Sequence, residues 1–319
     1  MALGQWHSPH YGTTMTAKIL PSLARCGLFP FALMLATASA WWYASGGVDH
    51  GVIIGLVSLA NIAILIVAER LLPYRHDWQT SHHDILTDLL HNLLNSYAFR
   101  ELCKVSLLAM LLPLTAATAA HGAWWPHHWP LWLQVVLTLA AAELGYYWIH
   151  RLSHERAALW PFHAIHHSAP RLYWLNAGRE HPIGVALFYV AGALPLIILG
   201  APAETLLFFY VIEAVHGQFQ HCNVSLTLGP LNRIFSSADL HRWHHSDDIS
   251  EANNNYGLTL SIWDSVFGTR YLPEGKEVEH IGISGMPNFP QSFGQQMLAP
   301  LRWSKLQNKE RQAADGQQP

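Results

Sequence analysis

Long apolar runs alternate with short polar connectors along most of this 319-residue chain. Residues 27–45 and 51–69 each approach the ~20 apolar residues that a helix needs to cross a bilayer. Residues 105–120 and 131–149 form a second pair of the same kind. These four runs predict two membrane-spanning helical hairpins.

A third pair of apolar runs, at residues 183–200 and 203–215, is shorter and contains Pro195. Proline removes a helical hydrogen bond, so this hairpin is expected to enter the membrane without necessarily crossing it. The predicted fold is therefore all-α. It is a polytopic membrane bundle of four spans, with the third hairpin as an open addition and a cytoplasmic histidine-rich helical cap.

Lysine and arginine lie on one side of the four predicted spans. The connectors at 46–50 and 121–130 contain neither residue, whereas cations flank the other ends of the spans: Lys18, Arg25, Arg70, Arg75, Arg100, Lys104, Arg151 and Arg156. Cytoplasmic flanks carry the excess of Lys and Arg in membrane proteins. Both termini and the cap are therefore expected in the cytoplasm.

Composition excludes several classes of protein. The net charge of −3 provides no basic field for nucleic acid. Cys26, Cys103 and Cys222 lie far apart in the sequence, so they form neither a disulfide framework nor a zinc-finger pattern.

Histidines gather between residues 150 and 245. They form an HxxxH motif, two HxxHH motifs and a further pair: His150, His154, His163, His166, His167, His216, His221, His241, His244 and His245. Positions i, i+3 and i+4 share one face of a helix, and neutral imidazole suits Zn, Cu, Fe and Ni. Ten histidines are too many for one ion and about right for two.

Two other kinds of metal-binding protein, a zinc metalloprotease and a haem protein, agree less well with the sequence. A zinc metalloprotease would show HExxH, but the second histidine after His154 and Glu155 would fall on Ala158. A haem needs one or two axial histidines. Glu143 lies two helical turns before His150, which predicts a hydrogen bond to a ligand histidine, with a helix-packing hydrogen bond as the alternative.

The segments "ELGYYWIHRLSH", "WPFHAIHH", "FQHCN" and "LHRWHHSDD", with "NNNYGLTLSIWDSVFGT", resemble the fatty acid hydroxylase/sterol desaturase superfamily over about residues 85–272. The resemblance implies O2 activation at a non-haem di-iron centre. It also implies electrons from NAD(P)H through a separate cytochrome b5-like or ferredoxin-like protein. Reactions of this family are hydroxylation, desaturation and ether cleavage of lipids.

The resemblance assigns the ten clustered histidines to two irons, although His216 is one residue further from His221 than in some members. It gives outer positions around the metal site to five other residues: Asp88, His91, Glu143, His181 and Asn223. It names no catalytic residue beyond the metal centre. The expected domains are an N-terminal segment (1–26), a first hairpin (27–84), the catalytic domain (85–272) and a tail (273–319).

The substrate is expected to enter from the bilayer along the third hairpin, past Ala193 and Gly200. The alternative for this hairpin is that it only anchors the protein. A fatty acyl chain, a sterol, a carotenoid and an aminolipid all remain open as substrates, as do hydroxylation, desaturation and ether cleavage as reactions. A non-redox zinc-binding membrane protein on the same histidine frame is the alternative function. A bacterial inner membrane is favoured over the endoplasmic reticulum.

Overall fold

The computed structural model describes residues 15–44, 46, 50–121, 124–226 and 228–315. Within this part of the chain the fold is all-helical and contains no strand, as predicted. For residues 15–24, 43–44, 50–54 and 112–121 the description concerns the backbone alone.

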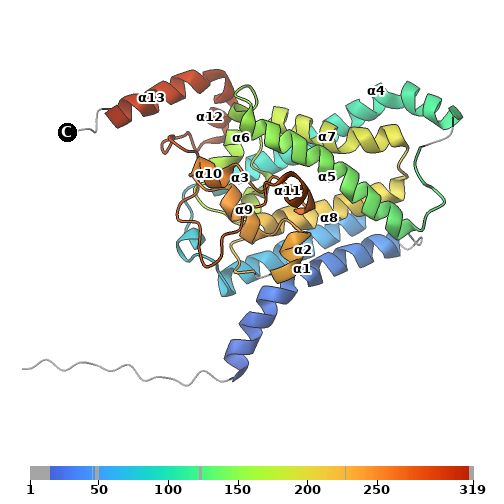
Figure 1. Cartoon of the computed structure of the whole chain (residues 1–319), viewed down its shortest axis with the longest axis horizontal. Coiled ribbons are helices and arrows are strands. Elements are labelled where there is room, and N and C mark those ends of the chain that lie inside the picture. The colour runs from blue at the N-terminus through green and yellow to red at the C-terminus, as the bar shows by residue number, and fades with distance from the viewer. Residues whose placement is uncertain (1–14, 45, 47–49, 122–123, 227, 316–319) are drawn as a thin grey trace, which may run out of the picture.

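The six predicted apolar runs are the six long helices of the described chain. These are α1 (Met15–Ala44), α2 (His50–Leu71), α4 (Arg100–His121), α5 (Leu131–Glu155), α7 (Pro182–Leu199) and α8 (Ala203–His221). They lie roughly side by side, and α1, α4 and α7 finish at the same end of the bundle (Figure 1). The short helices gather at the opposite end, where they form a cap.

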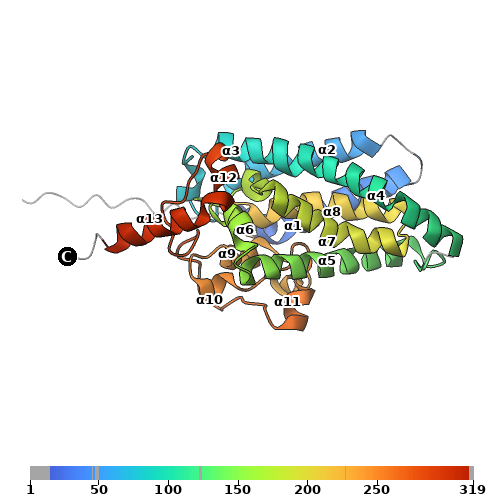
Figure 2. The ribbon, with the colours of Figure 1, turned by 90° about the horizontal axis from the view of Figure 1, so that it is seen from above.

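Helix α7 lies between α4 and α5 and packs against both (Figure 2). Glycines allow the close approach of α5 and α7, because a side chain on Gly145 would collide with the Ala191 backbone, and one on Gly192 with the Tyr146 ring. The sequence predicted that 105–120 and 131–149 pair as a hairpin, whereas α7 lies between the helices that contain them, α4 and α5. On the other side of α8, buried Ala32, Ala36 and Ala40 of α1 belong to the core that contains Phe208 and Val211.

The cap and its connections consist of short helices. In chain order they are η1 (Asp77–Gln79), α3 (Ile85–Leu90), the π-helix η2 (His91–Phe99), α6 (Trp160–His167), η3 (Trp174–Gly178), η4 (Gly229–Arg233), α9 (Ala238–His244), α10 (Ile249–Ala252), α11 (Ile262–Phe267), α12 (Phe293–Leu298), η5 (Pro300–Arg302) and α13 (Trp303–Asp315). π-Helical turns are rare and are frequent at functional sites.

Among the described residues, one helix, Pro182–Leu199, is both long and apolar enough to cross a membrane by length and composition. The sequence pattern had made this run the weakest of the spans because of Pro195. The proline lies inside α7, and the helix continues beyond it to Leu199. Large apolar side chains are also exposed on other helices, among them Met34 on α1, Leu59 on α2 and Val105 on α4.

Candidate metal centre

Four helices bring histidines together at the cap end of the bundle. His150 and His154 lie at the end of α5, and His221 is the last residue of α8. The two HxxHH motifs end α6 and α9, where His245 follows directly as the C-cap. All of these side chains except the half-buried His154 are buried.

Nine of the ten clustered histidines form two groups. In each group every histidine contributes one ring nitrogen, and these nitrogens all lie within 4.8 Å of one another. Group 1 consists of His150, His154, His163, His167 and His244. Group 2 consists of His166, His221, His241 and His245. The groups adjoin one another, since the rings of His167 and His245 stack with centroids 4.5 Å apart.

Each HxxHH motif is shared between the two groups. In the α6 motif the first and last histidines belong to group 1, and His166 belongs to group 2. In the α9 motif the first and last histidines belong to group 2, and His244 belongs to group 1. Because i and i+4 point along one line of a helix and i+3 lies beside it, one short helix can serve two adjacent sites.

The segment Asn253–Tyr256 holds the outer nitrogens of group 1. The backbone oxygens of Tyr256 and Asn254 lie 2.7 Å from His150 Nδ1 and 2.8 Å from His244 Nδ1. Asn253 Oδ1 lies 3.2 Å from His154 Nδ1. An imidazole that donates its Nδ1–H outward presents the Nε2 lone pair inward.

Group 2 has a similar outer contact from η3. Asn176 Oδ1 lies 2.9 Å from His221 Nδ1. The inner nitrogens then converge: His221 Nε2 lies 3.2 Å from His166 Nε2 and 2.9 Å from His241 Nε2. One hydrogen cannot satisfy three converging lone pairs, whereas one cation can.

This donor set fits a pair of transition-metal ions. Ligand nitrogens about 2.1 Å from a tetrahedral ion lie about 3.4 Å apart, close to the 2.9–3.2 Å separations within the groups. The buried Nε2 atoms of His154 and His244 have no hydrogen-bond partner. Burial also lowers the pKa of the group histidines, to about 4 for His244 and, with the neighbouring His244 imidazole, to about 3 for His166. The rings are therefore neutral, as ligands must be.

His216 stands apart from both groups. Its Nε2 lies 2.7 Å from the backbone oxygen of Ser236, and its ring packs edge-on against Phe29. The structure therefore corrects the sequence-based ligand set at this position. The cause lies in the spacing, because a separation of five positions, i to i+5, places the side chains of His216 and His221 on different faces of α8.

Three other predicted neighbours of the metal site have different partners. Glu143 accepts hydrogen bonds from the backbone of Thr259 (2.9 Å) and Leu260 (3.2 Å), so it holds the loop after Tyr256 and touches no group histidine. This corresponds to the helix-packing alternative. His181 caps α7 by accepting from the Ile183 amide at 3.1 Å.

Asn223 exchanges two hydrogen bonds of 2.9 Å with the backbone of Arg75, and so anchors the segment after α2. Asn176, in place of Asn223, is the amide that contacts His221. No periodicity marks Asn176 in the sequence, because it belongs to a short 3₁₀ helix.

Asp88 and His91 contact the loop of Arg179 and Glu180, which lies next to the histidine groups. Asp88 is fully buried and accepts from Arg179 Nε (2.6 Å) and the Tyr173 hydroxyl (2.7 Å). His91 Nε2 lies 2.8 Å from Gln296 Oε1, and His91 Nδ1 lies 3.0 Å from the backbone oxygen of Glu180. Asn95 Nδ2 donates to the same backbone oxygen at 2.8 Å. These contacts fix the loop that carries Arg179 and its neighbour Glu180.

Glu180 is a half-buried acid that the sequence analysis did not single out. Its Oε1 lies 3.3 Å from His166 Nδ1 and 3.8 Å from His163 Nδ1, so one carboxylate faces both histidine groups. Burial raises the pKa of Glu180 to about 8. The available signal was its position directly before His181, but loops provide no periodicity from which to infer the orientation of a side chain.

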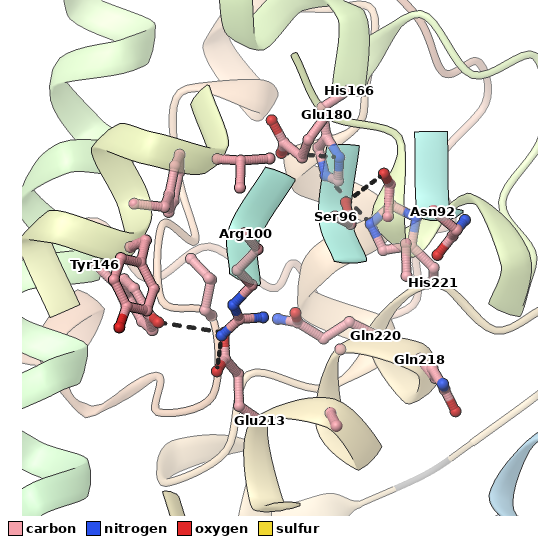
Figure 3. Close-up of a pocket in the computed structure, with 18 of the residues that line it drawn as sticks. Asn92, Ser96, Arg100, Tyr146, His166, Glu180, Glu213, Gln218, Gln220 and His221 are labelled. Atoms are coloured by element: carbon pink, nitrogen blue, oxygen red, sulfur yellow. Dashed lines mark hydrogen bonds and ion pairs between the residues drawn. The ribbon is translucent and has the colours of Figure 1, made fainter. Parts of the chain in front are cut away.

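A cavity of about 400 Å3 opens beside both groups. His150, His163, His166 and His241 line it together with apolar Val185 and Phe188 of α7. Figure 3 shows His166 and Glu180 at one end of this cavity and Arg100 with Glu213 at the other. A bound molecule in this space can therefore contact both a charged pair and the histidines.

The predicted channel residues do not line this cavity. Ala193 is buried, and Gly200 ends α7 in a left-handed conformation (φ 79°) that favours glycine. The lining of α7 lies nearer its start, at Val185, Phe188 and Tyr189. The third hairpin does border the cavity, but near its cap end.

Comparison with known proteins defines the class of this helical, histidine-rich protein. Residues 135–269 match the fatty acid hydroxylase family. The chain is 38% identical to ornithine lipid hydroxylase OlsE of Rhizobium tropici over 80% of this chain and 78% of that protein. It is 32% identical to alkylglycerol monooxygenase of Danio rerio and 31% identical to that of Homo sapiens, over 48% and 46% of this chain and 33% and 31% of theirs. No solved structure matches the chain.

The chain belongs to the fatty acid hydroxylase/sterol desaturase superfamily, as its histidine motifs predicted. The expected enzyme class, an O2-dependent lipid-modifying oxidoreductase, is confirmed with it. These relatives do not support the alternative function, a non-redox zinc-binding membrane protein.

Proposed function

We propose that this protein is a membrane-embedded, non-haem di-iron monooxygenase that hydroxylates a lipid. The convergence of nine buried histidines into two adjoining groups beside one cavity supports this function most directly. When bound, two irons would supply O2 activation and oxidation of a C–H bond. One oxygen atom enters the product and the other leaves as water, with two electrons from the donor and two protons.

The roles of the protein's own residues follow from their contacts. The Asn253–Tyr256 segment orients group 1, while Asn176 and Glu180 orient group 2. Val185 and Phe188 give the cavity an apolar wall that admits part of a lipid and limits water. A proton could be held at Glu180, the one acid that faces both groups among the described residues.

Placement in a membrane accounts for the pattern of charge. The connectors 46–50, 121–130 and 200–202 contain no Lys or Arg. The helix ends that they join lie at the end of the bundle away from the cap. Arg70, Arg100 and Arg151 lie toward the cap end. The positive-inside rule then puts the cap in the cytoplasm, where a separate cytochrome b5-like or ferredoxin-like donor can reach it with electrons from NAD(P)H.

The test is reconstitution of the purified protein with iron, a reducing system, O2 and ornithine lipid, because that lipid appears in the name of the Rhizobium tropici relative. A product heavier by one oxygen atom, labelled by 18O2 and absent under anaerobic conditions, is the expected result. Iron analysis should give two ions per chain. Turnover with firmly bound zinc alone would contradict the proposal.

A further inference from the structure

An ion pair stands in the cavity at the end away from the histidines. Arg100 Nη2 lies 2.6 Å from Glu213 Oε2, and the Tyr146 hydroxyl donates to Glu213 Oε1 at 3.2 Å. All three residues line the cavity (Figure 3). The side chains of Arg100 and Glu213 are 32% and 16% exposed, so water and ligands can reach both.

The pair bridges two helices across the cavity. Helix α4, which starts at Arg100, packs mainly against α7 and η2, whereas α8 packs mainly against α1, η3 and α5. A guanidinium offers five N–H donors. The hydrogen bond to Glu213 uses Nη2, and the described residues accept no further hydrogen bond from Arg100, whose guanidinium lies over the Tyr210 ring at 5.6 Å.

We propose that Arg100 and Glu213 recognise a zwitterionic lipid head group, with Arg100 binding its anionic group and Glu213 its ammonium. This inference rests on the proposed lipid hydroxylation, for which it defines the substrate class. An uncharged sterol or acylglycerol would leave both charges without a ligand. A purely anionic head group would meet the Glu213 carboxylate, and a purely cationic one would meet Arg100.

The same pair sets where the lipid is oxidised. With the head group held at Arg100 and Glu213, the cavity extends past Phe188 to His150 and His163. The carbon presented to the histidines therefore belongs to the head group or to the adjoining part of a chain, and the far end of each acyl chain stays in the bilayer.

A structural role for the ion pair is the competing explanation, and modified lipids separate the two. The ligands are ornithine lipid with a free carboxylate and a free ammonium, its carboxyl methyl ester and its N-acetylated form. Phosphatidylethanolamine tests the other common source of a zwitterionic head group. Binding is measured by native mass spectrometry of the full-length protein in detergent, without turnover.

Charge-assisted hydrogen bonds of this kind change affinity about tenfold or more when one is lost. Wild-type protein should bind each capped lipid at least about tenfold more weakly than ornithine lipid. Arg100→Gln should bind ornithine lipid and the methyl ester equally, and Glu213→Gln should bind ornithine lipid and the N-acetyl form equally. Lys104→Gln is the matched control, because Lys104 pairs with Glu101 one turn along α4 and does not line the cavity.

Equal affinity of wild-type protein for the parent and both capped lipids would overturn the proposal, even if neither variant folds. The proposal would also be overturned if each variant lowered the affinity for the parent lipid and for the capped lipids by the same factor, because that pattern indicates a structural effect. Tighter binding of phosphatidylethanolamine would keep the two residues and change the lipid source. Selective binding without hydroxylation would refute the proposed function and leave this inference standing.

Discussion

At the scale of single residues, the carboxylate of Glu180 connects the two histidine groups. It faces His166 of group 2 at 3.3 Å and His163 of group 1 at 3.8 Å, and its second oxygen has no partner. A carboxylate that accepts from a ligand imidazole fixes the ring and raises its basicity. Glu180 is therefore placed to affect both metal positions.

Because burial raises the pKa of Glu180 to about 8, we predict that Glu180→Gln lowers metal affinity by about tenfold or more above pH 8, where the side chain is an ionised partner of a ligand histidine. Glu180→Asp should retain part of the affinity. Competition with a chelator measures the effect directly, without turnover. Glu155→Gln, on the outer side of α5, is the control. Unchanged affinity in Glu180→Gln would show that this carboxylate only borders the cavity.

His91 provides a pH-dependent contribution to stability. Burial lowers its pKa to about 4 from an ordinary value of 6.5. The unfolded chain therefore takes up a proton first, and the stability that neutral His91 provides above pH 6.5 is lost as the pH falls toward 4. At pH 5 the cost is about 2 kcal/mol.

The loss should appear as a fall in unfolding temperature between pH 8 and pH 5, and His91→Asn should reduce that fall. Wild type and His91→Asn are compared in the metal-free state, so that the pH dependence caused by the other histidines is the same in both proteins and cancels in the difference. His280→Asn, at an exposed position, should behave as wild type. Identical pH dependence in wild type and His91→Asn would refute the assignment.

At the scale of elements, the sequence predicted the long helices well and their packing poorly. Apolar run length is sufficient to place α1, α2, α4, α5, α7 and α8. The order in which helices pack depends on complementary surfaces, such as Gly145 against the Ala191 backbone, and no periodicity encodes these. Within the site, helical spacing brought the HxxHH histidines together, whereas the loop residues Glu180 and Asn176 could not be placed.

The sharing of each HxxHH motif between groups leads to an element-level prediction. The double variant His167→Ala/His244→Ala removes two residues of group 1 and should leave about one bound metal per chain. The double variant His167→Ala/His245→Ala removes one residue from each group and should leave less than one. Metal analysis of the purified proteins distinguishes them. Equal losses would mean that each motif serves one ion.

At the scale of the whole molecule, the direction of the bundle decides how the substrate and the electron donor reach the site. The ends of α1, α4 and α7, which precede the connectors without cations, lie at one end of the bundle, and the cap lies at the other (Figure 1). Exposed apolar side chains on α1, α2 and α4 give the bundle a surface suited to lipid. A lipid can then approach the cavity from the side while a protein partner approaches the cap.

Cysteine labelling tests this orientation. After Cys26 and Cys103 are replaced by serine, with buried Cys222 left in place, single cysteines are introduced at Trp124 and Asp247. Both positions are exposed, on the connector after α4 and on the cap after α9. In intact cells an impermeant maleimide should label Trp124→Cys, and should label Asp247→Cys only after permeabilisation. The reverse pattern would place the cap outside the cytoplasm and remove the route for a cytosolic electron donor.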